Sequence, residues 1–225
     1  MCGRFTLRVP TSAIVEHFAL LGKMPLLAPR YNIAPTQPVA VVRLDGRATT
    51  PRRELASLRW GLIPHWAKDP SIGARMINAR AETVAEKPAY KAALRRRRCL
   101  VPADGFYEWR KDRNRKQPYF ISLHDDRLFA FAGLWESWEG ADHSYIESCT
   151  LLTTEPNELI RPIHDRMPVI LSRNAYDLWL DPAVQDAARL TPLLCPCPAE
   201  GMQARAVGTL VNSPRNDSPA CISPE

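Results

Sequence analysis

The chain has 225 residues, 24% charged and 45% hydrophobic, which is the composition of an ordinary globular protein with one large domain. Its 30 Lys and Arg residues against 24 Asp and Glu give a net charge of +6, which favours an anionic partner such as nucleic acid, although the same excess can serve solubility alone. No apolar run approaches the roughly 20 residues that cross a bilayer, and Arg4, Arg8 and Glu16 interrupt any signal-peptide core, so we expect neither a membrane protein nor a secreted one.

The six cysteines are expected to be reduced thiols, because no secretory signal is found. They are Cys2, Cys99, Cys149, Cys195, Cys197 and Cys221. The Cys-Pro-Cys-Pro segment at 195–198 could supply two metal ligands, but the other cysteines are scattered and the five histidines show no metal-ligand spacing. We therefore predict no disulfide framework, no metal site and no cofactor.

The first residues, Cys2 to Leu7, predict a short strand in which Cys2, Arg4 and Thr6 share one face. Once Met1 is removed, the chain begins with an α-amine and a thiol on adjacent carbons, and these groups titrate at about pH 8 and about pH 8.5. An amine condenses with an aldehyde to a Schiff base, and the neighbouring thiolate can then close a thiazolidine ring on the same carbon. The alternative is that Cys2 is a small buried hydrophobic residue.

A helix and a β-meander follow. Thr11 and Ser12 begin a helix that carries Ile14 and Phe18 on one stripe. The apolar segments at 39–43 and 58–62 predict strands of a meander.

A polar trio marks the next predicted strand, which runs over 76–83. Period-two alternation places Asn78, Arg80 and Glu82 on one face, which lines either solvent or a site. A short helix then ends in the run Arg95–Arg98. Four arginines at a helix end are either a solvated face that complements the helix dipole or a patch that contacts phosphates.

The segment Cys99–Trp109 is the most informative part of the middle of the chain, and within it Glu108 lies between two aromatic residues in an apolar strand. An ionised carboxylate is costly there unless it is paired or its pKa is raised, and a raised pKa suits a general acid and base. A partly exposed glutamate on an edge strand is the equal alternative. The segment 110–117 follows as a basic hairpin tip. Further strands are predicted at Tyr119–Leu123, Leu128–Trp135 and Tyr145–Thr154.

A single histidine, His164, lies in a loop bracketed by prolines and is flanked by Asp165 and Arg166. Its ordinary pKa of about 6.5 suits proton transfer, although a lone histidine is more often structural. From Asn212 the chain is rich in Pro, Ser and Asn, so a disordered tail is predicted over 212–225.

Several motifs together resemble the SOS response-associated peptidase family, in the family's order, from Cys2 to about Val211. They are Met-Cys-Gly-Arg-Phe at residues 1–5, Arg-Tyr-Asn-Ile-Ala-Pro at 30–35, Ile-Asn-Ala-Arg-Ala-Glu at 77–82, Gly-Phe-Tyr-Glu-Trp at 105–109, Ile-His-Asp-Arg-Met-Pro at 163–168 and Ala-Val-Gly at 206–208. The resemblance implies a single α+β domain over 2–211, with a curved, barrel-like antiparallel sheet flanked by short helices.

The resemblance also implies a function, the capture of abasic sites in single-stranded DNA as a covalent thiazolidine crosslink. Cys2 matches the crosslinking cysteine, and Asn78 matches the asparagine that holds the reacting sugar or the terminal amine. Glu108 matches the carboxylate that moves protons during Schiff-base and ring formation, and His164 the histidine that assists opening of the deoxyribose. A cytoplasmic monomer, associated with the nucleoid when bound to DNA, is expected.

Five further residues are assigned to DNA binding. Arg80 and Arg166 match arginines that clamp flanking phosphates, to which a guanidinium fork is suited. Arg4 is assigned to phosphate contact, Asn32 to lining the site and Trp66 to base stacking.

Two other functions stay open. Cys2 could be the nucleophile of a thiol peptidase, with His164 or Glu108 as its base, acting on its own N-terminus or on other peptides. The chain could instead be a non-catalytic module that binds single strands. A β-elimination lyase activity can accompany crosslinking, because a Schiff base at an abasic site acidifies the neighbouring carbon.

Overall fold

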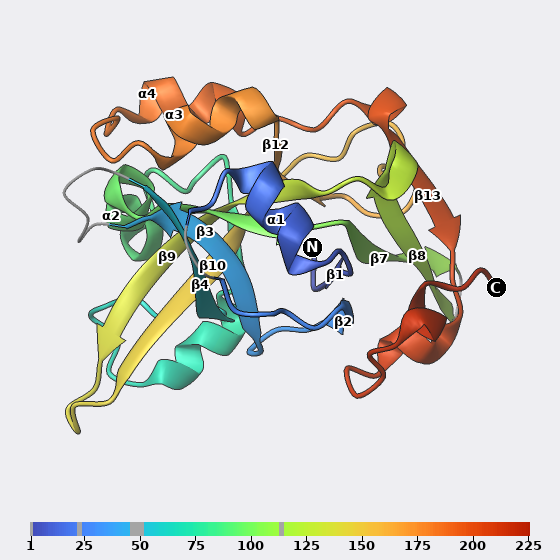
Figure 1. Ribbon diagram of the computed structural model, residues 1–225, viewed down its shortest axis with the longest axis horizontal. Helices are drawn as coiled ribbons and strands as arrows, with labels where there is room; N and C mark the ends of the chain where they lie inside the picture. Colours follow the sequence, from blue (N-terminus) through green and yellow to red (C-terminus); the bar gives the residue numbers. More distant parts are fainter. Residues whose placement is uncertain (1, 22–23, 46–51, 113–114) are drawn as a thin grey trace.

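Five strands pair in a closed ring that forms the barrel-like core of the molecule (Figure 1). The structure is a computed structural model that describes residues 2–21, 24–45, 52–112 and 115–225. The ring consists of β3 (Pro38–Leu44), β4 (Arg53–Trp60), β6 (Arg98–Ala103), β9 (Phe129–Glu139) and β10 (Tyr145–Thr154). The pair β10–β4 is parallel and the other pairs of the ring are antiparallel, so the predicted antiparallel barrel needs correction at this junction.

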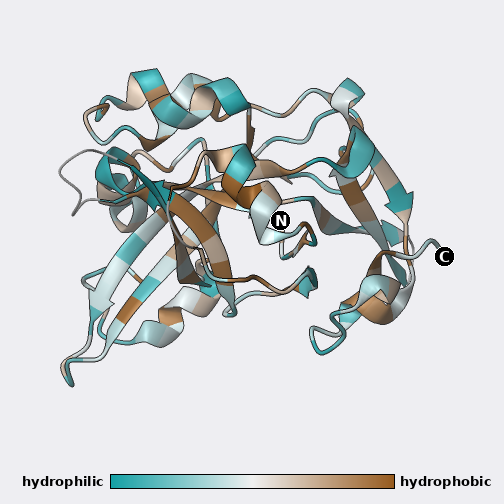
Figure 2. Cartoon of the chain, in the orientation of Figure 1, coloured by the Kyte–Doolittle hydropathy of each residue, from teal (hydrophilic) through white to brown (hydrophobic). Residues whose placement is uncertain are grey.

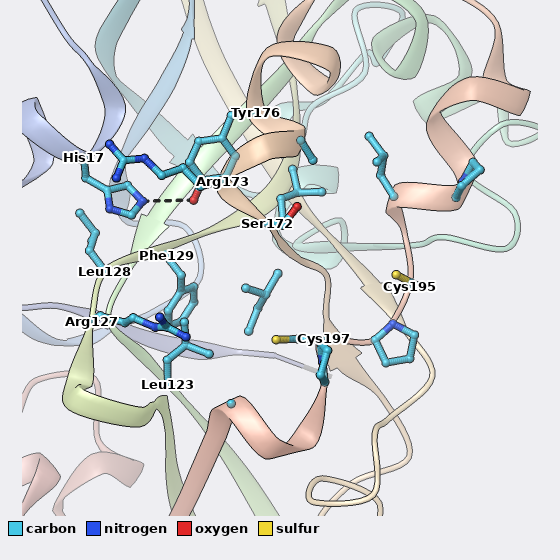
Figure 3. A pocket seen from close by; sticks show the side chains of 18 residues that line it. His17, Leu123, Arg127, Leu128, Phe129, Ser172, Arg173, Tyr176, Cys195 and Cys197 are labelled. Carbon is cyan, nitrogen blue, oxygen red and sulfur yellow. Dashed lines mark hydrogen bonds between the residues drawn. The ribbon is translucent and has the colours of Figure 1, made fainter.

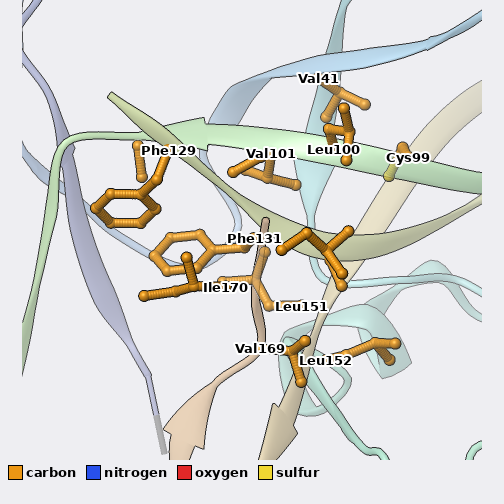
Figure 4. Close-up of a cluster of buried hydrophobic side chains, with 14 of the residues drawn as sticks. Val41, Cys99, Leu100, Val101, Phe129, Phe131, Leu151, Leu152, Val169 and Ile170 are labelled. Carbon is orange, nitrogen blue, oxygen red and sulfur yellow. The ribbon is translucent and has the colours of Figure 1, made fainter. Parts of the chain in front are cut away.

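The interior of the ring is apolar and closely packed. Every residue of β6 is buried, and β3 is hydrophobic along most of its length (Figure 2). Figure 4 shows Val101 and Phe131, which are partners on the paired strands β6 and β9, within this cluster. Gly133 on β9 lets strands approach here, because a Cβ at this position would lie 2.8 Å from the Cys99 sulfur. Burial of this apolar surface is the main force that holds the ring together.

Three short strands extend the ring at β10 and β9. They are β5 (Asn78–Arg80), β11 (Met167–Pro168) and β12 (Ile170–Leu171). β5 runs parallel to β10, and β11 pairs antiparallel with its last two residues. The strand predicted over 76–83 is therefore shorter than expected, and the chain turns after Arg80. This arrangement brings Asn78 and the loop before β11 to the same end of β10.

A second sheet of five antiparallel strands lies beside the ring, in the order β13-β8-β7-β1-β2. Its strands are β1 (Arg4–Leu7), β2 (Arg30–Ile33), β7 (Gly105–Asp112), β8 (Arg115–Leu123) and β13 (Met202–Ala206). Asp104 separates β6 from β7, and Glu108 lies on β7. The buried Asp104 carboxylate accepts hydrogen bonds from Thr6 Oγ1 at 2.5 Å and from Arg8 Nε at 3.0 Å. These bonds fix β1 against β7.

The helices are short and cover the outside of the sheets (Figure 1). The α-helices are α1 (Thr11–Phe18), α2 (Pro88–Arg96), α3 (Tyr176–Leu180) and α4 (Ala187–Leu190). The 3₁₀ helices are η1 (Pro70–Arg75), η2 (His124–Asp126), η3 (Arg173–Ala175), η4 (Thr191–Leu193), η5 (Ala199–Gly201), η6 (Thr209–Asn212) and η7 (Pro219–Ile222). The prediction of a single α+β domain with a barrel-like core is confirmed. Within the described residues, no helix has the length and apolar character needed to cross a membrane.

The run Arg95–Arg98 divides between two roles. Arg95 and Arg96 are exposed, as a solvated helix end predicts. Arg98 is instead only 3% exposed, and its guanidinium donates to the main-chain oxygens of Leu94, Arg95, Trp179 and Asp181. It therefore fastens the end of α2 to the end of α3, and it is not available to a phosphate.

The C-terminal segment 212–225 is folded against β2, which corrects the predicted disordered tail. Asp217 accepts from the main-chain N–H groups of Tyr31 and Asn32, and its carboxylate also pairs with Arg30. Cys221 is fully buried. The composition of the segment is polar, but its polar groups are bonded to the sheet edge rather than to water.

Candidate functional site

Cys2 lies at the start of β1 and is fully buried. The register of β1 against β7 puts Arg4 opposite Tyr107, so the terminus reaches the level of Glu108. Burial raises the pKa of the Cys2 thiol, and the nearby Glu108 carboxylate raises it further. The sulfur also lies 3.8 Å from the main-chain oxygen of Arg4. At neutral pH the group is therefore a thiol and not a thiolate.

Asn78 holds the main chain of Cys2. Its Nδ2 donates to the Cys2 carbonyl oxygen at 2.8 Å. Its Oδ1 is buried and accepts no hydrogen bond from any residue that the structure describes. A buried amide oxygen without a partner is costly, so this atom is a ready acceptor for an amine or a sugar hydroxyl.

Glu108 projects from β7, which is an interior strand between β8 and β1. It is 2% exposed, so the alternative of a partly exposed glutamate on an edge strand is wrong. Burial raises the pKa of Glu108 to about 7. A carboxyl group with this pKa can both donate and accept a proton at neutral pH.

His164 faces Glu108 from the loop between β10 and β11. Its Nε2 lies 4.0 Å from Glu108 Oε2. Its Nδ1 has two competing neighbours, the main-chain N–H of Arg166 at 3.0 Å and Asp165 Oδ1 at 2.9 Å. The Asp165 side chain is 88% exposed and screened by water, so the fixed N–H donor decides the tautomer and places the ring proton on Nε2. Burial lowers the pKa of His164, which favours this neutral form.

Two hollows flank Glu108 and His164, and both are lined by Trp109, Lys111 and His164. The first has a volume of about 530 Å³ and is also lined by Arg4, Glu108 and Lys116. The second has a volume of about 580 Å³ and adds Arg110 and Arg161. We call these two hollows together the Cys2 groove. Lysine and arginine side chains line both of them, so the groove is basic along its length. Sequence reasoning identified 110–117 only as a basic hairpin tip and did not assign Lys111, Lys116 or Trp109 to the site; residues 113–114 of that tip lie outside the described residues.

A third hollow of about 440 Å³ borders Asn78. It is lined by Trp66, Arg80, Lys87 and Tyr90 among others. Trp66 is 53% exposed, which is unusual for so large an apolar side chain and leaves its face open to a stacking partner. The structure thus brings Trp66 and Arg80 together beside Asn78.

The other residues predicted to bind DNA have partners within the protein. Arg166 forms a two-pronged ion pair with Glu82, at 2.7 and 2.9 Å, so its guanidinium fork is occupied. Asn32 is fully buried and cannot line the site; its Nδ2 donates to the main-chain oxygen of Asn216 at 2.7 Å. Arg4 bonds to Asn32 and to the oxygen of Val211, although it also lines the first hollow.

No group of three or more His, Cys, Asp and Glu side chains within the described ranges could hold a metal ion. The reactive groups that the structure brings together are the Cys2 thiol, the Asn78 amide, the Glu108 carboxyl group and the His164 imidazole.

The sequence was compared with known proteins. Residues 1–214 match the family model of the SOS response associated peptidase (SRAP). The abasic site processing protein YoqW of Bacillus subtilis (strain 168) is 47% identical over 225 residues, covering 99% of each chain. The abasic site processing protein HMCES of Xenopus tropicalis is 35% identical, covering 87% of this chain and 66% of its own.

Two solved structures have the same fold. A protein from Bacteroides thetaiotaomicron superposes with a TM-score of 0.88 at 25% identity, and the match covers 100% of both chains. A protein from Bordetella bronchiseptica superposes with a TM-score of 0.76 at 27% identity, covering 92% of this chain and 100% of its own.

Proposed function

Because the chain belongs to the SOS response associated peptidase family, we propose that it processes abasic sites in DNA and captures them in single strands as a thiazolidine at Cys2. The observation that carries this proposal is the convergence of Cys2, Asn78, Glu108 and His164 at one buried point of a basic groove.

The first step is the opening of the sugar. An abasic deoxyribose is mostly a closed hemiacetal, and opening it moves a proton from the anomeric hydroxyl to the ring oxygen. Neutral His164 presents its Nε2 proton toward Glu108. The two residues together can therefore donate a proton to the ring oxygen and accept the proton of the anomeric hydroxyl. The product is the aldehyde that the next step requires.

The second step joins the terminal amine of Cys2 to the aldehyde carbon after Met1 has been removed. The amine nitrogen bonds to carbon, and the carbonyl oxygen leaves as water with two protons. Glu108, with a pKa of about 7, supplies a proton to the departing oxygen. Asn78 Oδ1 accepts a hydrogen bond from the nitrogen and orients it.

The third step closes the ring. The Cys2 sulfur bonds to the same carbon, the thiol proton leaves through the Glu108 carboxylate, and the nitrogen takes up the electron pair of the C=N bond. Burial keeps the free thiol protonated, and the positive iminium carbon lowers the cost of losing this proton. The net reaction joins aldehyde, amine and thiol and releases one water.

The hollows on either side of Cys2 and Glu108 provide a path for the DNA strand that flanks the abasic site. Lys111 and Lys116 on one side, with Arg80 on the other, would neutralise phosphates, and each phosphate contact in single-stranded DNA contributes about 0.7 to the slope of log affinity against log salt. Trp109 and Trp66 would stack on unpaired bases, which requires no particular sequence.

A thiol peptidase that acts on other proteins is less consistent with the site. Such enzymes need a low-pKa thiolate, whereas burial raises the pKa of Cys2. Removal of the protein's own Met1 is compatible with crosslinking, because it would supply the amine.

The test is denaturing gel electrophoresis with single-stranded DNA that contains one abasic site. The wild type should give a heat-stable shifted band that Cys2→Ala loses, and Cys2→Ser should give a band only after borohydride reduction. A stable band with Cys2→Ala, or no wild-type band when mass spectrometry shows Met1 to be absent, would sink the proposal.

A further inference from the structure

A large cavity lies away from the Cys2 groove. It has a volume of about 830 Å³, which is in the range of ligand-binding pockets. It lies between α1, the β8–β9 turn, β12, α3 and the segment 191–201 (Figure 3). None of its lining residues lines the hollows around Cys2, so the chemistry proposed above leaves this cavity without a role.

The inner surface of the cavity is apolar. Leu128, Phe129 and Ile170 belong to the hydrophobic core, yet they line the pocket with one side. Figure 3 shows Phe129 directed into the pocket from β9. Binding of an apolar ligand that removes this surface from water is therefore favourable in free energy.

Positive charge is concentrated at the mouth. Arg127 and Arg173 are both exposed and both line the pocket, and Asp and Glu are absent from its described lining. Neither guanidinium has an ion-pair or hydrogen-bond partner among the residues that the structure describes. Figure 3 places the two arginines at different points along the pocket. His17 and Tyr176 lie beside Arg173, with His17 Nε2 at 3.3 Å from the Tyr176 hydroxyl oxygen. The mouth thus suits a ligand that carries negative charge at more than one point.

One wall restricts how a ligand can be held. It is formed by the Cys-Pro-Cys-Pro segment at 195–198 together with Pro192. Pro192, Pro196 and Pro198 have no N–H group, so this wall offers few main-chain donors to a ligand. A ligand has to enter with an apolar group first and be recognised by packing inside and by charge at the mouth.

We propose that this pocket binds the carboxyl terminus of a partner protein that ends in a bulky apolar residue preceded by acidic residues. The apolar side chain fills the inner surface, the terminal carboxylate binds one arginine, and an acidic side chain binds the other. A simple fatty acid carries a single negative group and leaves the second arginine without a partner. Guanidinium groups bind carboxylates with two parallel hydrogen bonds, which makes them specific for such a terminus.

Binding is tested with the full-length protein by fluorescence anisotropy. The probes are fluorescein-labelled hexapeptides Gly-Asp-Asp-Asp-Leu-X with a free carboxylate, where X is Phe, Leu or Ser. The Phe and Leu peptides should bind saturably, and the Ser peptide and a Phe peptide with an amidated terminus should bind about tenfold more weakly, a difference of roughly 1.4 kcal/mol. Equal binding of the free and amidated peptides, or no binding of any peptide, overturns the proposal.

Variants locate the interaction. Arg127→Gln combined with Arg173→Gln should weaken the Phe peptide at least about tenfold, and Arg189→Gln on the exposed face of α4 should not. None of these residues lines the Cys2 groove, so crosslinking to abasic DNA should be unchanged in every variant and reports that the protein is folded. Unchanged peptide binding by the double variant contradicts the proposal.

Protection of Cys195 provides an independent readout. This thiol is exposed and lies in the wall of the pocket, so a bound peptide should slow its alkylation by N-ethylmaleimide, as mapped by peptide mass. Protection by decanoate and by none of the peptides would overturn the proposal in favour of a free organic acid.

Discussion

Two buried glutamates of this protein have opposite surroundings. Glu136, on β9 of the ring, is 4% exposed and its Oε2 lies 2.6 Å from Arg97 Nη2 and 3.5 Å from His65 Nδ1. Glu108, on β7 of the second sheet, is 2% exposed and faces the imidazole of His164 at 4.0 Å. Burial raises the pKa of Glu108 to about 7.

The difference shows how one fold separates stability from chemistry. The Arg97 guanidinium holds the Glu136 side chain in an ion pair, which makes Glu136 a structural group. A carboxyl group that is buried to the same degree, and whose pKa is raised to about 7, exchanges protons at neutral pH. The structural carboxylate therefore lies on the ring of strands, whereas the reactive carboxyl group lies on the second sheet and meets Asn78 and His164 from segments beside β10.

Truncation inside the ring should have the largest effect. Phe131→Ala removes a fully buried phenyl group that contacts Phe5, Phe106 and Phe129 edge-on. It should lower the free energy of unfolding by about 3–5 kcal/mol. Urea unfolding measures this loss. The crosslinking rate per folded molecule should be unchanged. A fall in that rate together with the loss of stability would show that the packing of the ring of strands and the geometry of the site are coupled.

Exchange of the two glutamates for glutamine sharpens the comparison. Glu108→Gln should slow crosslinking at least about 100-fold, because a general acid and base is lost. Its free energy of unfolding at pH 8 should be equal to that of the wild type or higher, because an ionised carboxylate is no longer buried.

Glu136→Gln is the matched control. It leaves Arg97 without its anionic partner and should cost about 1–3 kcal/mol of stability while crosslinking persists. Rates come from quenched time courses on denaturing gels. If the two variants exchanged these phenotypes, the assignment of structural and reactive carboxyl groups would be reversed.

The pH dependence isolates the Glu108 proton. The raised pKa means that the neutral acid dominates below about 7 and the carboxylate above it. If the neutral form donates to the departing oxygen, the ratio of the wild-type rate to the Glu108→Gln rate should fall about tenfold per pH unit above this value. Dividing the rates removes the ionisation of the terminal amine, which both proteins share. A ratio that is constant from pH 6 to 9 would exclude this role.

The C-terminal segment should detach when its anchor is removed. Asp217→Ala deletes the acceptor of the Tyr31 and Asn32 N–H groups and should cost about 1–2 kcal/mol. Limited proteolysis should then cut beyond residue 212, whereas Glu200→Ala, also on the surface, should resist. Equal resistance of Asp217→Ala would mean that other contacts hold the segment.

The smallest effect is expected at the phosphate-binding edge. Arg80→Ala should weaken binding of single-stranded DNA and reduce the slope of log affinity against log salt by about 0.7, whereas Arg189→Ala should leave the slope unchanged. Anisotropy titrations at several salt concentrations measure the slope. Loss of affinity with an unchanged slope would point to a structural effect of Arg80.

Local patterns predicted much of this molecule. The strands around Glu108 and from Tyr119 onward, and the helix that ends in the arginine run, were predicted because each depends on neighbouring residues, whereas the sequence left the burial of Glu108 open. The barrel and the roles of site residues rested on resemblance. The parallel junction between β10 and β4 was not readable, since it depends on pairing between distant segments.

The errors have a common physical cause. Asn32 was predicted to line the site, and Arg98 either to be solvated or to contact phosphates, yet both are buried and bond to main-chain oxygens of distant segments. Arg166 was read as a phosphate clamp, yet its fork is taken by Glu82. Polar side chains find such partners only in the folded chain, so neither the resemblance that assigned Asn32 and Arg166 nor the composition of the segment 212–225 could show these contacts.

The most direct test of the account is peptide mapping by mass spectrometry of the protein after reaction with abasic single-stranded DNA and digestion of the DNA. The account predicts that the modification lies on an N-terminal peptide that begins at Cys2, with the loss of one water, no free thiol at Cys2 and no change after borohydride. A modification on a lysine or on another cysteine, or a Cys2 adduct that still has a free thiol and is reduced by borohydride, would contradict it.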